Sequence, residues 1–271
     1  MAEYAYSTYI DSEDYIKGLE GLYYSWAQTN SPNDFVILKT NEISNELLLP
    51  QINDKRIKII EIPKYFIGYS HFLNEIENDI NVIDDPFTCW SRQYTNTLGQ
   101  FYAFNLTQYK AILNIHCDIL IRENLDYLFE KYNKDKTFYV CNIKEKQLPF
   151  DTIYNKVFTI DCFFWLIKPD PDIFEKLSNN YALRTLASNA NDIAEKFIYP
   201  MLDIKEILFE DSYNKIVHNT GPWKYWKVNK NFNPKDLLNK EEIEKIARTQ
   251  YFYSDTKIIS TKGQQMVNAY K

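Results

Sequence analysis

The stretch ILNIHCDILIRENLDYLF, residues 112–129, indicates the fold class of this chain. It begins with an apolar run, Ile112–Ile115, that is typical of a strand covered on both faces, as in a parallel sheet between helices. The apolar run stops at residues 116–118 and then resumes. Burial of an unpaired carboxylate costs free energy, so we do not expect Asp118 to serve only to fill space in the core. Because ligands of open α/β sheets bind just beyond the carboxyl ends of the strands, we expect Asp118 at a ligand site.

Strand-like and helix-like segments alternate around this stretch, which predicts an α/β fold with a Rossmann-like, mostly parallel central sheet flanked by helices. Ser12 is a suitable N-cap for the first helix. Strands are expected at residues 4–9, 34–40, 56–62, 112–115 and 137–143, with another in the first part of 157–177. Helices are expected at residues 11–26, 42–52, 98–110, 124–132, the last part of 157–177, and 241–249.

The composition suits one large globular domain, because 45% of the residues are hydrophobic and 25% are charged. We expect this domain to cover residues 1–227, followed by a polar C-terminal tail, residues 228–271, with one helix. The formal net charge of -6 argues against a nucleic-acid partner. No apolar run approaches a membrane span. The N-terminus lacks the features of a signal peptide and the four cysteines lack CxxC spacing, so we expect free thiols and a cytoplasmic location.

Three side chains from two distant parts of the sequence suggest a metal site. His116 and Asp118 follow the strand at 112–115, and His218 comes about a hundred residues later; together they offer ligands for one divalent ion. Gly221 would let backbone approach a phosphate, and Lys224 would supply a positive charge to it. A metal and a lysine on one diphosphate would stabilise a departing nucleoside diphosphate. Each residue alone also has a structural interpretation, such as a hydrogen-bonded turn at the strand end.

Four blocks of the sequence resemble glycogenin and its relatives in glycosyltransferase family eight. The resemblance covers about residues 4–227 and keeps the order of the blocks. They are YSTYIDSEDYIKGLEGLYYSW (6–26), DFVILKTNEIS (34–44), FNLTQYKAILNIHCDILIRENLDYLFE (104–130) and HNTGPWKYW (218–226).

The resemblance implies a GT-A fold, a UDP-sugar donor, Mn²⁺, and transfer with retention of configuration to a glycan or protein acceptor; a homodimer is left open. His116, Asp118 and His218 stand at the metal positions, and Lys224 serves both catalysis and diphosphate binding. Asp161 and Asp192 stand at positions that would orient the donor and the acceptor. The nucleotide-sugar positions are Tyr9, Asp11, Ser12, Tyr15, Gln100, Cys117, Gly221 and Lys224.

The chain departs from the family at several of these positions. His116 replaces the first aspartate of the family's Asp-any-Asp motif, and Gln100 replaces a lysine. Asp161 lies in Asp-Cys-Phe, where the family has Asn-Ser-Gly, and Asp192 has lost its flanking glycine and glutamine. These changes fit either a different donor sugar or a degenerate protein that binds a nucleotide-sugar or a partner without catalysis. Asp161 would either stabilise an oxocarbenium-like transition state or hydrogen-bond a backbone turn. A zinc hydrolase is a third interpretation, which three histidines and no H-E-x-x-H motif make weak.

Overall fold

The computed structural model describes residues 2–48, 53–63, 96–130, 138–140, 164–179, 215–218, 224–228 and 231–248. This part of the chain contains two sheets. Their strands are β1 (Tyr4–Ile10), β2 (Asp34–Lys39), β3 (Ile57–Glu61), β4 (Ala111–Ile115), β5 (Ile119–Ile121), β6 (Phe138–Val140), β7 (Phe164–Ile167) and β8 (Ile216–His218).

The larger sheet has six strands in the order β3-β2-β1-β4-β7-β6. Strands β3, β2, β1 and β4 run parallel, β7 is antiparallel to β4, and β6 is antiparallel to β7. Strands β5 and β8 form a separate antiparallel pair. The expected α/β class with a mostly parallel central sheet is therefore confirmed.

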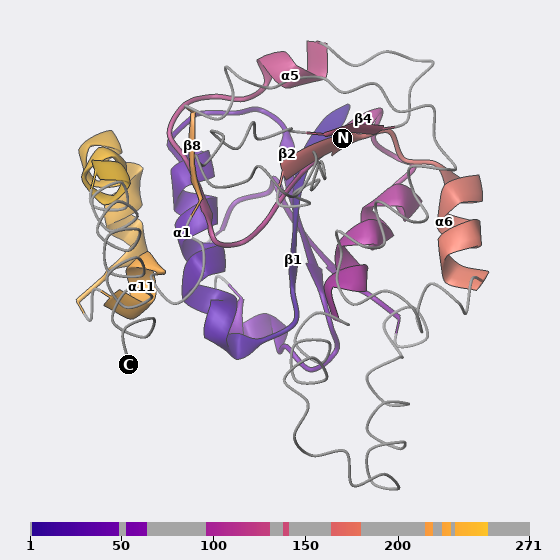
Figure 1. Cartoon of the computed structure of the whole chain (residues 1–271), viewed down its shortest axis with the longest axis horizontal. Helices are drawn as coiled ribbons and strands as arrows, with labels where there is room; N and C mark the ends of the chain where they lie inside the picture. The colour runs from indigo at the N-terminus through magenta and orange to yellow at the C-terminus, as the bar shows by residue number, and fades with distance from the viewer. Residues whose placement is uncertain are drawn as a thin grey trace, which may run out of the picture.

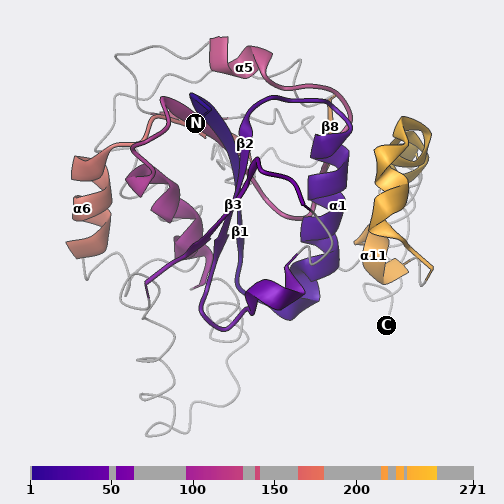
Figure 2. The ribbon, with the colours of Figure 1, turned by 180° about the vertical axis from the view of Figure 1, so that it is seen from behind.

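Helices cover both faces of the sheet (Figures 1 and 2). The helical segments are η1 (Glu13–Tyr15), α1 (Ile16–Ala27), η2 (Asn45–Leu47), η3 (Asn96–Asn105), α5 (Tyr127–Glu130), α6 (Pro171–Asn179), α11 (Tyr225–Val228), η5 (Pro234–Leu238) and residues 240–248. In Figure 1, α1 lies on one side of β1, and η3 and α6 lie on the other. Ser12 caps η1 as expected, because its hydroxyl accepts from the Asp14 backbone N–H.

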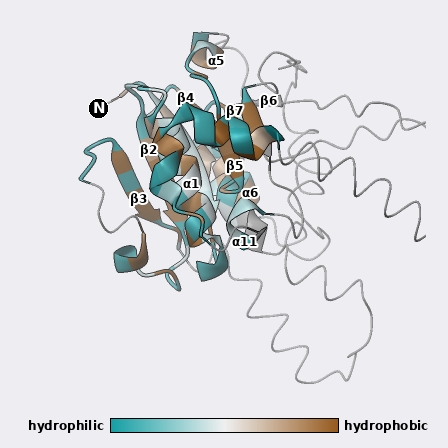
Figure 3. Cartoon of the chain, turned by 90° about the vertical axis from the view of Figure 1, so that its left-hand side faces the viewer, coloured by the Kyte–Doolittle hydropathy of each residue, from teal (hydrophilic) through white to brown (hydrophobic). Residues whose placement is uncertain are grey.

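The core has two layers, one on each face of the sheet, because side chains alternate along a strand. Within β4, Leu113 packs into the layer under α1, and Ile112 into the layer under η3 and α6. In β7, Leu166 and Trp165 divide in the same way. Figure 3 shows brown and teal residues interspersed along α1, and most of this helix is buried.

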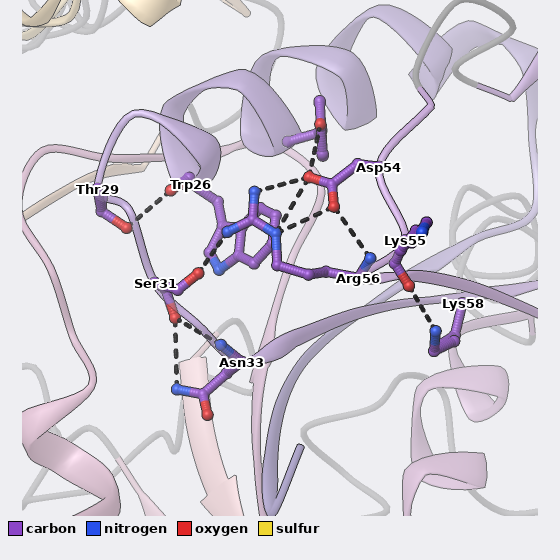
Figure 4. Close-up of polar contacts among 9 residues, drawn as sticks. Trp26, Thr29, Ser31, Asn33, Asp54, Lys55, Arg56 and Lys58 are labelled. Carbon is purple, nitrogen blue, oxygen red and sulfur yellow. Dashed lines mark hydrogen bonds and ion pairs between the residues drawn. The ribbon is translucent and has the colours of Figure 1, made fainter. Parts of the chain in front are cut away.

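Arg56 fixes the end of α1 to the start of β3 (Figure 4). Its guanidinium lies 4.4 Å from the centroid of the Trp26 ring and donates to the backbone oxygen of Ser31. Arg56 Nη2 also lies 2.6 Å from Asp54 Oδ2, and this carboxylate accepts a 3.1 Å bond from the Tyr23 hydroxyl. Since Ser31 precedes β2, this cluster sets the spacing of the first strands at the edge opposite the predicted ligand site.

Residues 231–248 pack on the outer side of α1 (Figures 1 and 2). Leu237, Ile243 and Ala247 are buried in the same core layer as α1. The guanidinium of Arg122 joins this segment to β5 through two bonds to the Glu244 carboxylate, of 2.8 and 2.6 Å. The predicted C-terminal helix is thus present and adds apolar contacts to the core. In the described part of the chain, no helix is both long and apolar enough to cross a membrane.

Candidate functional site

The candidate site lies at the carboxyl ends of the parallel strands β1 and β4. Because the two strands run in the same direction, Asp11 after β1 and residues 116–118 after β4 leave the sheet at the same edge. Helix α1 and η3 approach this edge from opposite faces of the sheet. The site therefore has two halves, which different layers of the fold position.

The first half is a buried ion pair between Asp118 and Lys224. Lys224 Nζ lies 2.6 Å from Asp118 Oδ2, and the two side chains are 8% and 11% exposed. Lys224 comes from the residue before α11, and Asp118 from the turn between β4 and β5, 106 positions earlier. The structure thus brings together two residues that the sequence placed at one diphosphate site.

Two aromatic rings enclose the Lys224 ammonium. Nζ lies 4.6 Å from the ring centroid of Tyr15 and 5.3 Å from that of Trp226. Burial alone would lower the Lys224 pKa, but the Asp118 carboxylate outweighs this effect and the pKa is raised. The ammonium therefore stays charged in a mostly apolar setting, where it interacts more strongly with an anion than it would in water. Burial raises the Tyr15 pKa, although the Lys224 charge opposes the shift, so the phenol stays protonated.

Residues 225 and 226 are docked on α1 through two glycines. A Cβ on Gly18 would lie 2.7 Å from Trp226 Cη2, and one on Gly21 would lie 1.9 Å from the Tyr225 hydroxyl oxygen. The Tyr225 hydroxyl donates to the Gly18 backbone oxygen at 3.3 Å. Both glycines lie within the helix, as predicted, and their missing side chains admit the two rings.

The second half of the site is a hydrogen-bonded row on the η3 face. His116 Nε2 lies 3.2 Å from Gln100 Oε1, and Asn114 Nδ2 donates to the same oxygen at 3.4 Å. The Ser7 hydroxyl donates to Asn114 Oδ1 at 2.8 Å, and these two residues pair in register across β1 and β4. The row holds the His116 ring through one of its nitrogens. Gln100, which was predicted to contact the nucleotide-sugar, here contacts a predicted metal ligand.

Buried polar atoms without a hydrogen-bond partner among the described residues collect near this edge. They include Tyr9 Oη, Gln100 Nε2, and the hydroxyls of Thr8 at the end of β1 and Thr40 just after β2. A Cβ on Gly99 would lie 2.1 Å from the Tyr9 ring, so η3 packs directly on Tyr9. Because native proteins rarely leave buried polar groups unsatisfied, these atoms mark where polar atoms of a ligand would be accommodated.

Cys117 lies between the two halves but is not arranged as a nucleophile. Its thiol is a free, buried group, as predicted for this cysteine. Burial, and then the Asp118 charge, raise the Cys117 pKa well above its usual range. A reactive cysteine needs a lowered pKa. Its predicted nucleotide-sugar contact remains a prediction.

Known structures resemble the whole fold. Galactosyltransferase LgtC, solved with donor and acceptor sugar analogues, is 13% identical; the match covers 90% of this chain and 95% of that chain, with a TM-score of 0.51. The glycosyltransferase GlyE of Streptococcus pneumoniae TIGR4 is 12% identical over 89% of this chain and 63% of that chain, with a TM-score of 0.53. The chain has the GT-A glycosyltransferase fold.

Sequence comparisons do not assign this chain to a family. No family model matches the sequence. Uncharacterized protein R707 of Acanthamoeba polyphaga mimivirus is 25% identical over 224 residues, which is 81% of this chain and 72% of that protein. The fold is therefore shown by the structural neighbours, while the specific resemblance to family eight stays a prediction.

In this GT-A fold the backbone brings the three predicted metal ligands into one region. Residue 218 pairs with Ile119 across β5 and β8, next to Asp118 and His116. One carboxylate and two imidazoles suit a divalent transition metal. Among the described residues no group of three such side chains is already assembled as a metal site. The Asp118 carboxylate instead holds Lys224, so it would have to share or exchange this partner with a metal ion.

The remaining predicted residues are placed as follows. Asp11 and Ser12 lie directly after β1, and Tyr15 ends η1. Asp161, Asp192 and Gly221 lie outside the described residues, and their predicted roles are not tested.

Sequence reasoning missed Asn114, Ser7 and the role of Trp226. Asn114 had a visible signal, since it is the polar residue in the apolar run of β4. Ser7 had none, because its importance comes from its register with Asn114. Trp226 had no role in the sequence analysis; it packs on Gly18 and also faces the Lys224 ammonium.

Proposed function

We propose that this protein is a retaining glycosyltransferase that moves a sugar from a UDP-sugar to a glycan or protein acceptor with the help of a divalent cation, Mn²⁺ being the first candidate. The main support is the buried Lys224–Asp118 pair at the end of β4 in a GT-A fold. A charged lysine held there, beside the unsatisfied polar atoms of Tyr9 and Gln100, suits an anionic ligand with polar groups.

Lys224 would stabilise the leaving diphosphate. Its charge is preserved by Asp118 and enclosed by Tyr15 and Trp226, so it is oriented before the ligand arrives. Preorganised charge at a leaving group lowers the barrier because little reorganisation is needed during the reaction. A single lost contact of this kind costs about 10²–10³ in rate in well-studied enzymes.

Asp118, His116 and His218 would hold the metal. When bound, the ion would supply Lewis-acid stabilisation of the same diphosphate. Gln100 and Asn114 would fix the ring of His116, as outer hydrogen-bond partners commonly do for metal-binding histidines. Asp118 would be shared between the Lys224 ammonium and the metal, so that Lys224 keeps its orientation.

The sugar-transfer step needs no separate base among these residues. In the front-face reaction that the family resemblance implies, the bond from the anomeric carbon to the phosphate oxygen breaks as the acceptor oxygen attacks from the same side. The leaving phosphate takes the acceptor proton. Asp161 and Asp192 would orient the donor and the acceptor in this reaction.

The proposal is tested first by thermal unfolding with UDP, with and without Mn²⁺. A ligand at 100 times its Kd stabilises the folded state by about 2.7 kcal/mol, so we expect a clear Mn²⁺-dependent rise in Tm. Asp118→Ala should abolish the Mn²⁺-dependent part. Asp172→Ala, which removes an exposed carboxylate from α6, is the matched control and should keep the rise.

The second stage measures UDP release and sugar transfer from a panel of UDP-sugars. Release that depends on Asp118 supports the transferase. A UDP-dependent rise in Tm without turnover of any UDP-sugar would support the degenerate, binding-only alternative. No rise with UDP would contradict the proposed donor.

A further inference from the structure

Gly18 of α1 contacts both sides of the Asp118–Lys224 pair. A Cβ on Gly18 would lie 2.7 Å from Trp226 Cη2 and 2.8 Å from the backbone oxygen of Cys117. Cys117 directly precedes Asp118, and Trp226 is two residues after Lys224 and faces its ammonium. The glycine is thus in contact with the segment that carries the carboxylate and with the segment that carries the lysine.

Gly21 contacts a different residue one turn later. The three nearest atoms to a Cβ on Gly21 all belong to Tyr225, and the closest is 1.9 Å away. Neither the Cys117 backbone nor the Trp226 ring is among them. The turn that bears Asp118 is thus among the three nearest neighbours of Gly18 and not among those of Gly21.

We propose that Gly18 is a positioning residue for the diphosphate-binding lysine, because its bare Cα sets the distance between the Cys117–Asp118 turn and the Lys224–Trp226 segment. This inference rests on the proposed function, in which Lys224 binds the diphosphate of a UDP-sugar. Gly18 touches neither the donor nor the reacting atoms in this assignment.

A methyl group at this position cannot be accommodated without movement. Both contact distances are below 3.0 Å, which real Cβ atoms essentially never show, so at least one neighbour must shift. The Cys117 oxygen is backbone next to a buried ion pair, and the Trp226 indole N–H donates to the Asp14 backbone oxygen at 3.3 Å. Neither neighbour is the free end of a flexible chain, so the movement is expected to reach Lys224.

Helix propensity acts in the opposite direction. Alanine is a better helix former than glycine, so Gly18→Ala would strengthen α1 if the position were an ordinary helical site. A weaker site in Gly18→Ala would therefore come from the two contacts and not from the helix itself.

The experiment is calorimetric titration of UDP in the presence of Mn²⁺. We expect wild type to bind, Lys224→Met to bind more weakly, and Gly18→Ala to lose about tenfold in affinity, the size of one weakened charge-assisted hydrogen bond. Asp126→Ala is the control for lost stability: it removes the acceptor of bonds from Tyr6, Ser31 and Asn33, so it should lower Tm and leave UDP affinity nearly unchanged. An equal loss of affinity in Asp126→Ala would overturn the inference.

A double-mutant cycle separates positioning from general damage. If Gly18 acts through Lys224, Gly18→Ala should weaken UDP binding in wild type but add almost nothing in the Lys224→Met background, while its effect on Tm persists there. Equal losses of affinity in both backgrounds would overturn the inference.

A compensating variant covers the case in which Lys224→Met does not fold. Phenylalanine lacks the part of the indole ring that meets Gly18 and still provides an aromatic face for the ammonium. Gly18→Ala combined with Trp226→Phe should recover affinity relative to Gly18→Ala alone; no recovery would count against the inference. Absence of UDP binding by wild type would instead refute the proposed function, which keeps the two failures distinct.

Discussion

Removing one member of the Asp118–Lys224 pair should destabilise the protein much more than removing both. The two side chains are 11% and 8% exposed, and Nζ lies 2.6 Å from Oδ2. Removal of one partner leaves a buried charge uncompensated, which typically costs about 3–5 kcal/mol. Replacement of both by neutral residues of similar shape is commonly close to neutral. We therefore expect Lys224→Met to lose about 3 kcal/mol and Lys224→Met with Asp118→Asn to recover most of that loss.

The assays are urea unfolding, for the free energy, and thermal unfolding, for Tm, of wild type, the two single variants and the double variant. For a chain of 271 residues, an unfolding entropy of about 2 cal/mol/K per residue converts a loss of about 3 kcal/mol into a fall in Tm of about 5 °C. Each single variant should lose about 3 kcal/mol and the double variant about 1 kcal/mol or less, so the magnitude of the coupling energy should be about 5 kcal/mol. A coupling energy near zero, with losses that simply add, would refute the reasoning, because the two charges would then be solvated separately. Lys110→Met with its exposed partner Glu3 is the control pair, for which we expect little change in Tm.

Three further predictions test other parts of the structure. Asp126→Ala should lower the free energy of unfolding by about 3 kcal/mol, because Asp126 Oδ1 accepts bonds of 2.7–2.8 Å from three side chains. Urea unfolding measures this loss. Unchanged UDP affinity in the same variant would show that the effect is structural. The Arg122 bond lowers the Glu244 pKa below the ordinary value of a glutamate, 4.5. The stability difference between wild type and Glu244→Gln should therefore be full at neutral pH and shrink as the pH falls below 4.5; a difference that grows on acidification would contradict this sign. Cys117 should resist iodoacetamide in the native protein and react after unfolding, as followed by peptide mass mapping; rapid native labelling would contradict its burial.

The sequence predicted the elements that have a local signal. Alternating strands and helices follow from hydrophobic periodicity, and Ser12 at the start of η1 follows from capping chemistry. The position of Asp118 at the end of β4 was also predictable, because a charged residue that ends a buried strand needs a partner. The sequence named Lys224 as a charge for a phosphate and Asp118 as a metal ligand, and it did not predict that the two would pair with each other.

Features that depend on which segments meet could not be predicted in this way. The antiparallel direction of β7 depends on the route of the chain between strands, which periodicity does not encode. The row from Ser7 to Gln100 depends on the register between β1 and β4. Gly18 and Gly21 look like poor helix residues in the sequence, and their purpose becomes visible only when Tyr225 and Trp226 are docked against them.

The structure also changes the interpretation of the two departures at Gln100 and His116. In the family that the sequence resembles, these positions carry a lysine and an aspartate, whose charges have opposite signs. Here the two side chains are neighbours, with His116 Nε2 3.2 Å from Gln100 Oε1. When the imidazole is uncharged, this pair carries no net charge, as a lysine beside an aspartate also does. Loss of the lysine alone would have left an aspartate beside an uncharged residue, and loss of the aspartate alone would have left an excess cation. Asn114 adds a bond to the same Gln100 oxygen, so the three side chains form one hydrogen-bonded unit. We therefore expect substitution of Gln100 to alter what His116 binds, and this dependence would be measured as a change in Mn²⁺ affinity of Gln100→Ala.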